Sequence, residues 1–584
     1  MNSMHFRSSI KANLAGVFLA LTYFVLLLGT QDIGFPRDEG FYFSAGEQYS
    51  RWIDDLFADP VHAFSRENVE TRFGNNPEHP ALWKFLFGLS WRLFGAFSED
   101  KGARYWYEGG SPPKPIFGIM KESTAMRLPA MLVASFLVYL IFRFGFVFFN
   151  FRVGVASALA WMFMPHVFWH SHLACFDVPV TAMWFWTTYC FLRSMNGGGV
   201  RWAIYTGVVF GLALSTKHNS FFLPPVLVLF YLLTHYKEFS IKRSSDGGVR
   251  GISIPPIPWA FVAMLIISPV IYYLLWPKLW FDPIGHLKWY IQRHTAHEYY
   301  WAYYFGTLYT EPPFPIEFPF VMSLITIPGP TIVLAFLGGA VMLLRRFART
   351  SSMNESKVRG LGLFVFLNFL VPFAVIAHPK VPIFGGTKHW MHGVPYVALF
   401  AGVGVDYVLQ GLAQVKVERA WRACAWALAS LVMLLAPAFD TLHGYTNGST
   451  YYNAFVNGRR AMGEFGLQRE FWGNSAFSAL EYINKNAPQG ARVDFHDTAW
   501  DSVKMYRRVG LLREDIVPIW DYNNADYFLF HWHKEFLDLE GEVRGAFLSQ
   551  VPVFVVSQDG VPLLSAYKRG GQKAEKGTRG IGVR

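Results

Sequence analysis

The chain has 584 residues, of which 52% are hydrophobic and 18% aromatic, and its mean hydropathy is +0.23. A composition this apolar excludes an ordinary soluble enzyme. The formal net charge of +11 does not call for a nucleic-acid partner, because much of the excess lies in short loops between apolar segments.

Long runs without a charged residue recur along the chain, and about 20 apolar residues suffice for one membrane-spanning helix. Such runs lie between Lys11 and Asp32, Arg127 and Arg143, Arg152 and Asp177, Asp177 and Arg193, Arg201 and Lys217, Lys217 and Lys237, Arg250 and Lys278, Glu317 and Arg345, Arg359 and Lys380, Lys388 and Asp406, and Arg422 and Asp440. They predict a polytopic α-helical membrane protein with about 11 transmembrane helices. Several runs are short, so two of them could be re-entrant or strongly tilted.

The first run could also be a secretory signal, because Arg7 and Lys11 precede it. Its length and the lack of a small-x-small cleavage site favour a retained membrane anchor.

Lysine and arginine gather in three loops, at residues 237–250, 345–359 and 416–422. Counting the spans places all three loops on the side of the N-terminus, which the positive-inside rule assigns to the cytoplasm. The opposite, extracytoplasmic side then carries residues 31–125, 278–318, 379–389 and the segment after about residue 441.

The composition divides the chain into three parts. Residues 1–440 form a membrane domain that includes residues 31–125 as its first extracytoplasmic loop, residues 441–570 form a small soluble α/β domain, and residues 571–584 form a disordered tail. In the first loop, residues 41–57 and 81–97 have the amphipathic spacing of helices that lie in the membrane interface. In the soluble part, residues 553–556 predict a strand and residues 476–484 a helix.

Two adjacent carboxylates, Asp38 and Glu39, directly follow the first apolar run. A solvated acidic pair outside a helix would give the same pattern, but further ionisable groups on this side favour a functional site. These groups are Glu78, His79, Lys84, Arg127, Lys217 and His218. Cations that converge on an acid are typical of a site for an anionic, membrane-embedded substrate, most simply a lipid phosphate.

A divalent metal is an alternative that the sequence leaves open. His166, His170 and His172 cluster near Asp177, and histidines four residues apart on a helix can share a metal ion. A second candidate set combines Glu78 with His294, His297 or His389. The aromatic residues around the first cluster are more typical of interfacial packing, so no metal ligand is assigned.

Several segments resemble the protein O-mannosyltransferase family (glycosyltransferase family 39) in order and spacing. They are Asp38-Glu39, residues 78–86 (EHPALWKFL), Arg127-Leu128-Pro129, residues 172–179 (HLACFDVP), residues 211–218 (GLALSTKH), Thr387-Lys388-His389-Trp390 and Tyr451-Tyr452-Asn453. Each motif alone is weak, but their common order is specific. The chain departs from the family at Ala81, which replaces a second proline, and it has no room between the spans for the β-trefoil insertion of the eukaryotic enzymes.

The resemblance implies the GT-C fold, with an extracytoplasmic active site and a polyprenyl-phosphate sugar as donor. It also implies that Asp38 is the catalytic acidic residue, with Glu39 as its partner, and that Arg127 holds the donor phosphate. We expect Lys84, His79 and Lys217 to help bind this phosphate. We expect the substrate to contact Glu78, Asp177, His218, Lys388 and His389. A bacterial inner membrane, with the site facing the periplasm, is the expected location.

These features predict an inverting glycosyltransferase that moves a monosaccharide from a polyprenyl-phosphate donor to a hydroxyl group of a protein Ser or Thr, a lipid or a glycan. A carboxylate would take the proton of the acceptor hydroxyl, and fixed cations would stabilise the leaving lipid phosphate. The main alternative is a transporter or flippase for lipid-linked sugars, because such proteins also carry buried charges. Against it, the charges gather at one face and no internal repeat is evident. A non-catalytic scaffold leaves Asp38-Glu39 unexplained.

Overall fold

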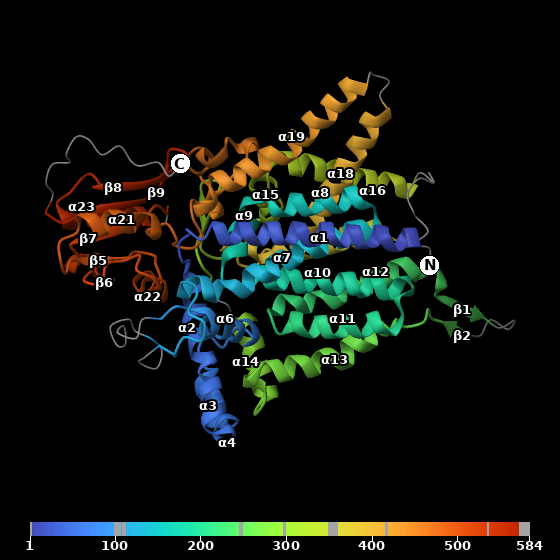
Figure 1. Ribbon diagram of the computed structural model, residues 1–584, viewed down its shortest axis with the longest axis horizontal. Helices are drawn as coiled ribbons and strands as arrows, with labels where there is room; N and C mark the ends of the chain where they lie inside the picture. Colours follow the sequence, from blue (N-terminus) through green and yellow to red (C-terminus); the bar gives the residue numbers. More distant parts are fainter. Residues whose placement is uncertain are drawn as a thin grey trace.

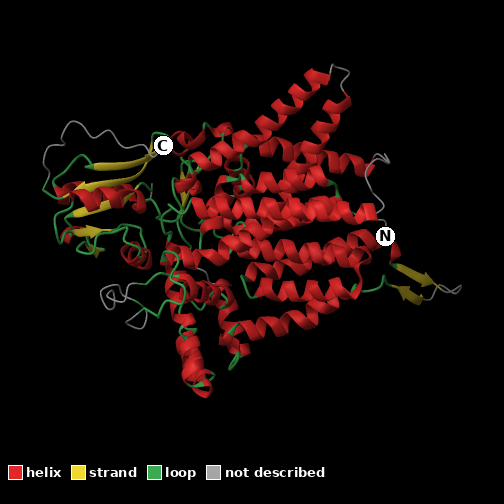
Figure 2. Ribbon diagram, viewed as in Figure 1, coloured by secondary structure: helices red, strands yellow, loops and turns green. Residues whose placement is uncertain are grey.

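The computed structural model describes residues 3–97, 107, 112–243, 249–295, 299–347, 360–414, 419–533 and 536–570. The expected tail at residues 571–584 and the metal candidate His297 lie outside the described residues. Most of the described chain is a bundle of long helices that lie side by side, and a smaller region with a β-sheet lies at one end of the bundle (Figures 1 and 2). The predicted helical membrane bundle is thereby confirmed.

Each uncharged run contains at least one helix of the bundle. The helices are α1 (Ser3–Gly29), α7 (Glu122–Phe148), α8 (Phe151–Met162), α9 (Pro165–His172), α10 (Asp177–Arg193), α11 (Gly199–Leu214), α12 (Leu223–His235), α13 (Trp259–Leu275), α15 (Phe318–Thr326), α16 (Gly329–Phe347), α17 (Leu361–Ile376), α18 (Val394–Gln414) and α19 (Arg419–His443).

By length and composition, five segments of the described chain can cross a membrane, or six if α8 and α9, which meet at a bend of 71°, form one span. One of the five, Asp177–Leu214, folds back on itself: α10 and α11 contact each other, and Asn196 and Gly197 leave helical geometry at the turn between them. The apolar helices α13, α16 and α17 are shorter. The count of about 11 spans therefore stays a prediction.

Small residues let the helices of the bundle approach closely, as is common in membrane proteins. A Cβ atom on Gly338 of α16 would lie 1.9 Å from the carbonyl oxygen of Phe400 in α18. A Cβ atom on Gly207 of α11 would likewise lie 2.5 Å from the carbonyl oxygen of Ala263 in α13. Larger side chains at these two glycines would push the helices apart.

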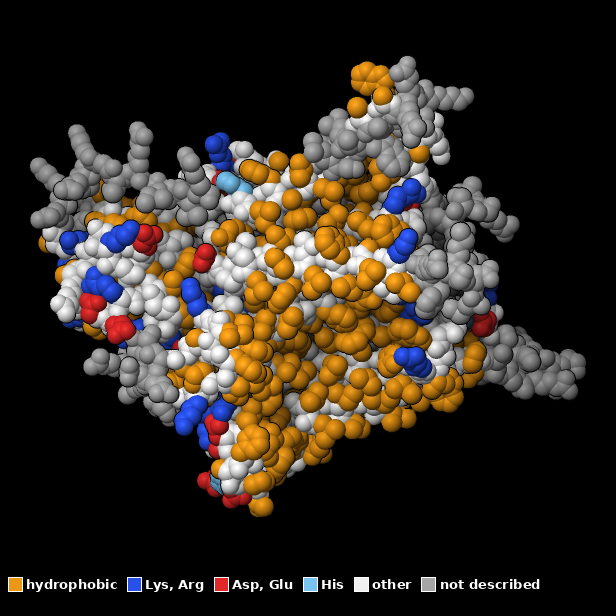
Figure 3. Space-filling view, viewed as in Figure 1, with side chains coloured by type: hydrophobic (Ala, Val, Ile, Leu, Met, Phe, Trp, Pro, Cys, Tyr) orange, Lys and Arg blue, Asp and Glu red, His pale blue; other side chains and the backbone are white. Residues whose placement is uncertain are grey.

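The two ends of the bundle differ in what they carry. The N-terminus and the hairpin of β1 (Ser240–Arg243) and β2 (Val249–Ser253) lie at one end, and the first loop and the C-terminal sheet lie at the other (Figure 1). Hydrophobic side chains cover the flank of the bundle between these ends (Figure 3). An apolar flank of this kind suits the hydrocarbon core of a bilayer.

The first loop contains α2 (Arg37–Ser50), which overlaps the predicted helical segment 41–57, and α6 (Leu82–Phe94), which lies in the predicted segment 81–97. Most residues of α2 are buried, because it contacts α6 and also α22 (Trp500–Arg508) of the C-terminal region. A Cβ atom on Gly88 would lie 1.9 Å from the carbonyl oxygen of Gly46, so the two loop helices cross almost in backbone contact. The helix α2 is therefore internal, and not a surface helix with one exposed face.

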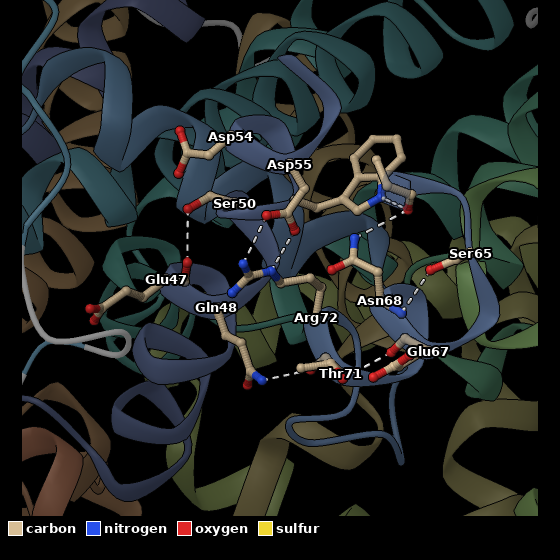
Figure 4. Close-up of polar contacts among 12 residues, drawn as sticks. Glu47, Gln48, Ser50, Asp54, Asp55, Ser65, Glu67, Asn68, Thr71 and Arg72 are labelled. Atoms are coloured by element: carbon tan, nitrogen blue, oxygen red, sulfur yellow. Dashed lines mark hydrogen bonds and ion pairs between the residues drawn. The ribbon is translucent and has the colours of Figure 1, made fainter. Parts of the chain in front are cut away.

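The helices α3 (Trp52–Ala58), α4 (Pro60–Ala63) and α5 (Arg66–Arg72) form an arm that extends beyond the bundle (Figure 1). Polar contacts tie this arm to α2 (Figure 4). Within the arm, Arg72 of α5 donates to both carboxylate oxygens of Asp55 of α3, at 2.6 and 2.8 Å. From α2, Gln48 Nε2 donates to the carbonyl oxygen of Thr71 at 2.7 Å, which ties the C-terminal end of α2 to the arm. Near α13, α14 (Pro283–Thr295) precedes a hairpin of β3 (Ala302–Tyr304) and β4 (Thr307–Tyr309).

The C-terminal region (residues 444–570) contains a five-stranded sheet in the order β6-β5-β7-β9-β8. Its strands are β5 (Arg492–Asp494), β6 (Val517–Ile519), β7 (Tyr527–His531), β8 (Phe554–Gln558) and β9 (Val561–Lys568), and its helices are α20 (Ala461–Glu464), α21 (Ala476–Asn486), α22 and α23 (Leu537–Phe547). The strands β5, β6 and β7 are parallel, whereas β9 runs antiparallel to β7 and β8. The strand predicted at residues 553–556 and the helix predicted at residues 476–484 correspond to β8 and α21.

Candidate functional site

Asp38 and Glu39 lie in the first turn of α2 but face different surroundings. Glu39 is fully buried and accepts hydrogen bonds from Arg127 Nε at 2.7 Å and Arg127 Nη2 at 2.6 Å. The backbone N–H of Ala174 also donates to Glu39 Oε1, at 2.8 Å. Both carboxylate oxygens of Glu39 are therefore used inside the protein.

Arg127, expected to bind the donor phosphate, is itself 1% exposed. Besides Glu39, it donates to the carbonyl oxygen of Gly34 at 2.9 Å, and its guanidinium lies 4.9 Å from the centre of the Phe35 ring. A buried cation with a bidentate carboxylate partner is already neutralised. These contacts fit a pair that holds the Asp38 loop onto α7 better than a phosphate ligand.

The side chain of Asp38 is 27% exposed, and its carboxylate forms an ion pair with Lys388. Lys388 Nζ donates to Asp38 Oδ2 at 2.8 Å, and Oδ1 has no hydrogen-bond partner among the described residues. Lys388 belongs to the short 3-10 turn Gly386–His389, just before α18. Its ammonium group also lies 3.6 Å from the centre of the Trp472 ring.

A second ion pair joins Asp177, the first residue of α10, to Lys217, which follows α11. Lys217 Nζ donates to Asp177 Oδ1 at 2.7 Å, and the two side chains are 7% and 13% exposed. The charges of Asp177 and Lys388 interact electrostatically. The structure thus brings together two carboxylates and two lysines, all four of which belong to the predicted site.

Two histidines border this group of charges. The pKa of His389 lies well below its ordinary value because of burial and because Lys388 and Lys217 are nearby. His170 is 4% exposed and lies within electrostatic range of Asp177, Lys388 and Asp38. The sequence presents His170 as a metal candidate, and its proximity to Asp38 was not apparent there.

Four other predicted site residues, Lys84, His79, Glu78 and His218, have partners outside this group of charges. Lys84 is fully buried and donates to the carbonyl oxygens of Asn76 and, at 2.9 Å, His79; burial holds its pKa well below the ordinary value. The ring of His79 packs near Phe176, with centroids 5.2 Å apart. These contacts make Lys84 a support for the loop that carries His79.

Glu78 and His218 lie toward α14 and α13. Glu78 Oε2 is 3.7 Å from Arg293 Nη2, and its side chain is 37% exposed. His218 Nε2 is hydrogen-bonded to the hydroxyl of Tyr272 at 2.6 Å, and its ring packs 3.8 Å from that of Tyr290. His218 therefore packs among aromatic side chains, whereas the neighbouring Lys217 pairs with Asp177.

A metal centre finds no support in the side-chain positions. Across the part of the chain that the structure describes, no group of three or more His, Cys, Asp or Glu side chains could hold a metal ion. His172, for instance, is hydrogen-bonded to the Thr30 hydroxyl at 2.8 Å through Nε2 and to the Phe168 carbonyl at 2.9 Å through Nδ1. Both of its ring nitrogens are thus already used.

An apolar groove of about 1530 Å³ lies between α15, α16, α17 and α18. Phe320, Phe336, Phe366, Phe373 and Phe400 are among its lining residues. Ser323, which also lines the groove, accepts a hydrogen bond from Trp390 Nε1 at 2.7 Å. Trp390 follows Lys388 by two residues, so the segment that carries Lys388 touches the groove lining through Trp390. Asn150, Arg152 and Lys237 line the groove as well.

Comparison with known proteins supports the resemblance that the motifs indicate. The sequence model of the family described as dolichyl-phosphate-mannose-protein mannosyltransferase matches residues 115–276. This segment contains Arg127, Asp177 and Lys217. No curated protein sequence matches the chain.

Structural comparison matches the chain to ArnT from Cupriavidus metallidurans in the apo state, with 13% identity, 96% of this chain and 98% of that chain covered and a TM-score of 0.48. The same enzyme bound to undecaprenyl phosphate is 14% identical, with 95% and 97% covered and a TM-score of 0.47. The Archaeoglobus fulgidus oligosaccharyltransferase in the apo form is 10% identical, with 89% of this chain and 69% of that chain covered and a TM-score of 0.47.

Proposed function

We propose that the protein is an inverting glycosyltransferase that moves one sugar from a polyprenyl-phosphate donor to a hydroxyl acceptor at the extracytoplasmic face of a membrane. The observation that carries the proposal is the partly exposed Asp38–Lys388 pair, which lies within electrostatic range of the Asp177–Lys217 pair. Trp390, two residues after Lys388, contacts Ser323 of the apolar groove. The match to the mannosyltransferase family model at residues 115–276 supports a lipid-phosphate sugar as donor.

Asp38 is the base. Its Oδ1 is available to accept the proton of the acceptor hydroxyl as the acceptor oxygen attacks the anomeric carbon. A hydroxyl group is a poor nucleophile at neutral pH, and a positioned carboxylate typically accelerates such a step by about 10²–10⁴-fold. The bond from the anomeric carbon to the phosphate oxygen breaks in the same displacement, so the configuration at that carbon inverts.

Lys388 and Lys217 stabilise the leaving group. The departing lipid phosphate gains negative charge as the bond breaks, and cations that are already in place stabilise this charge at no cost of reorganisation. In the structure each lysine pairs with a carboxylate, at 2.8 and 2.7 Å. The phosphate replaces Asp177 as a partner of Lys217 and bridges toward Lys388, while Lys388 keeps its contact with Asp38.

The groove between α15 and α18 holds the prenyl chain. It is lined mainly by phenylalanine and aliphatic side chains, and it begins near Trp390. A polyprenyl tail is a long chain of apolar, methyl-branched isoprene units, and burying its surface contributes roughly 25 cal/mol per Å². Anchoring the tail there places the phosphate at the membrane edge, beside the lysines.

Glu39 and Arg127 position the base. Their buried pair joins α2 to α7, and the Ala174 amide ties Glu39 to the segment that leads into α10. We assign to them the placement of Asp38 against Asp177, and no direct contact with the phosphate.

The decisive experiment compares the envelope glycans and glycolipids of a strain that lacks the gene with those of its parent by mass spectrometry, which identifies sugar and acceptor together. The proposal expects one glycoconjugate to lose a single sugar residue. A flippase would instead move labelled lipid-linked sugar across proteoliposomes without consuming it. Movement without release of lipid phosphate would contradict the proposal.

A further inference from the structure

The C-terminal region contacts the loop of Asp38 directly. The backbone N–H of Arg37 donates to the carbonyl oxygen of Trp472 at 2.9 Å, and the guanidinium of Arg37 forms an ion pair with Asp497. The backbone N–H of Phe35 donates to the hydroxyl of Tyr506 at 2.8 Å, and the rings of these two residues stack with centroids 4.7 Å apart. The residues immediately before Asp38 are thus bound by a part of the chain more than 400 residues away.

The same region also holds α2 beyond Asp38. The Ser44 hydroxyl donates to Asp501 and accepts from Lys504 Nζ at 3.1 Å. One turn further along, Arg508 Nη1 pairs with Glu47 at 2.8 Å, and their side chains are 2% and 0% exposed. These partners all lie on α22, so one helix of the C-terminal region follows α2 along its length.

Trp472 contacts Lys388 and also Arg37, the residue next to Asp38. Its carbonyl oxygen binds the amide of Arg37, the neighbour of Asp38, and its ring lies 3.6 Å from Lys388 Nζ. The ring of Trp472 fits because Gly385 has no side chain: a Cβ atom on Gly385 would lie 2.8 Å from Trp472 Cη2. The backbone φ of Gly385, +76°, also favours glycine. A cation over an indole face is attracted to it, most strongly where water is excluded.

We propose that Trp472 and Asp497 are positioning residues of the active site, through which the C-terminal region holds the base and its lysine partner in reacting geometry. The inference rests on the proposed function and assigns a role to the C-terminal region, which the sequence leaves open. A displacement of about 1 Å between reacting groups can lower a rate by about 10²-fold. The residues before Asp38 are held at Arg37 by Trp472 and Asp497 and at Phe35 by Tyr506, so loss of the Trp472 or the Asp497 contact moves the carboxylate.

The test uses the full-length protein in nanodiscs with mannosyl-phosphoryl-undecaprenol and glucosyl-phosphoryl-undecaprenol as donor probes. Asp497→Asn removes the charge but keeps the size of the side chain, and Arg37→Gln breaks the same pair from the other side. Both variants are expected to lower kcat about tenfold or more and to change the KM for donor by less than about threefold. The double variant should lose no more than either single variant, because both act through one contact.

At the contact between Trp472 and Lys388, Trp472→Leu should also lower kcat about tenfold or more. Trp472→Phe keeps an aromatic face under Lys388 and should recover most of the lost kcat. The matched control is Glu481→Gln, which breaks an exposed ion pair between Glu481 and Lys485 on α21. Equal kcat for Asp497→Asn, Trp472→Leu and the control would overturn the inference.

Hydrogen exchange of the same variants separates this inference from the proposed function. The amides of Phe35 and Arg37 should exchange faster in Trp472→Leu and Asp497→Asn than in the wild type or in Glu481→Gln. If the wild type transfers no sugar from any probe, the proposed function fails, and the exchange rates alone decide whether the C-terminal region holds the loop. Unchanged exchange in both variants would show that it does not.

Discussion

Asp38 and Glu39 are neighbours in the sequence, yet they pair with different cations and differ in burial. Glu39 is completely buried, and its carboxylate is occupied by Arg127 and by the amide of Ala174. Asp38 is 27% exposed, and one of its oxygens binds Lys388. Glu39 has the contacts of a structural ion pair, whereas Asp38 has those of a group that can still react.

The difference shows how one acidic dipeptide can supply both a reacting group and its support. A buried charge is tolerated when it is fully paired and hydrogen-bonded, and such a pair cannot readily exchange its partner for a substrate. A carboxylate near the surface, with only one oxygen hydrogen-bonded to a cation, can exchange that partner for a substrate. Substitutions that break the Asp38–Lys388 pair and the Glu39–Arg127 pair separately test this difference.

The largest effect on activity is expected at Asp38. Asp38→Asn keeps the size of the side chain but cannot accept the acceptor proton, so sugar transfer should fall by about 10²–10⁴-fold. Transfer is measured with membranes that contain equal amounts of each variant. Asp32→Asn, an exposed acid at the same end of α1, is the matched control and should keep full activity. Near-normal transfer by Asp38→Asn would remove the base from the mechanism.

The largest effect on stability is expected at Glu39. Glu39→Gln leaves the buried guanidinium of Arg127 without its counter-charge, which typically costs about 3–5 kcal/mol. The melting temperature of the detergent-solubilised protein reports this loss. The double variant Glu39→Gln, Arg127→Gln should be more stable than Glu39→Gln alone. If Arg127→Ala instead raised the KM for donor with no loss of stability, Arg127 would hold the phosphate after all.

A smaller effect on activity is expected at the two lysines. Lys388→Met and Lys217→Met each remove one of the two cations that we propose to stabilise the leaving phosphate, which should reduce kcat/KM for the donor by about 10²-fold. Lys485→Met, at an exposed lysine on α21, serves as the control in the same assay. An unaltered donor kcat/KM in both site variants would show that the phosphate is bound elsewhere.

The smallest effect concerns pH and lies away from the site. Burial, with a further contribution from Asp521, raises the pKa of Asp494 in β5 to about 7. Because the folded protein holds this proton more tightly than the unfolded chain, stability should decrease as pH rises from about 4 to about 7 and then level off. Asp494→Asn should flatten this part of the curve of melting temperature against pH. A slope equal to that of the wild type would exclude Asp494 as its source.

Much of the bundle could be predicted from the sequence, because the local absence of charge marks each apolar helix. The helical segments of the first loop follow from a second local signal, the spacing of their apolar residues. The burial of α2 does not, because it depends on α22, which lies more than 450 residues further along the chain.

The members of the site could be predicted better than their partners. Asp38, Asp177, Lys217 and Lys388 follow from charge at the membrane edge and from the family resemblance, and the structure brings all four together. The partner of Arg127 is 88 residues away and that of Lys388 is 350 residues away. No local signal in the sequence marks such distant pairs, so the Glu39–Arg127 and Asp38–Lys388 contacts could not be predicted from it.

The most direct test of the account is a single-turnover measurement with donor already bound. Wild-type protein and Asp38→Asn, each in nanodiscs, are loaded with mannosyl-phosphoryl-undecaprenol, and release of undecaprenyl phosphate is followed after addition of a hydroxyl acceptor. The account predicts that both proteins bind the donor and that only the wild type releases the lipid phosphate at an appreciable rate. Equal release rates in the two proteins would contradict it.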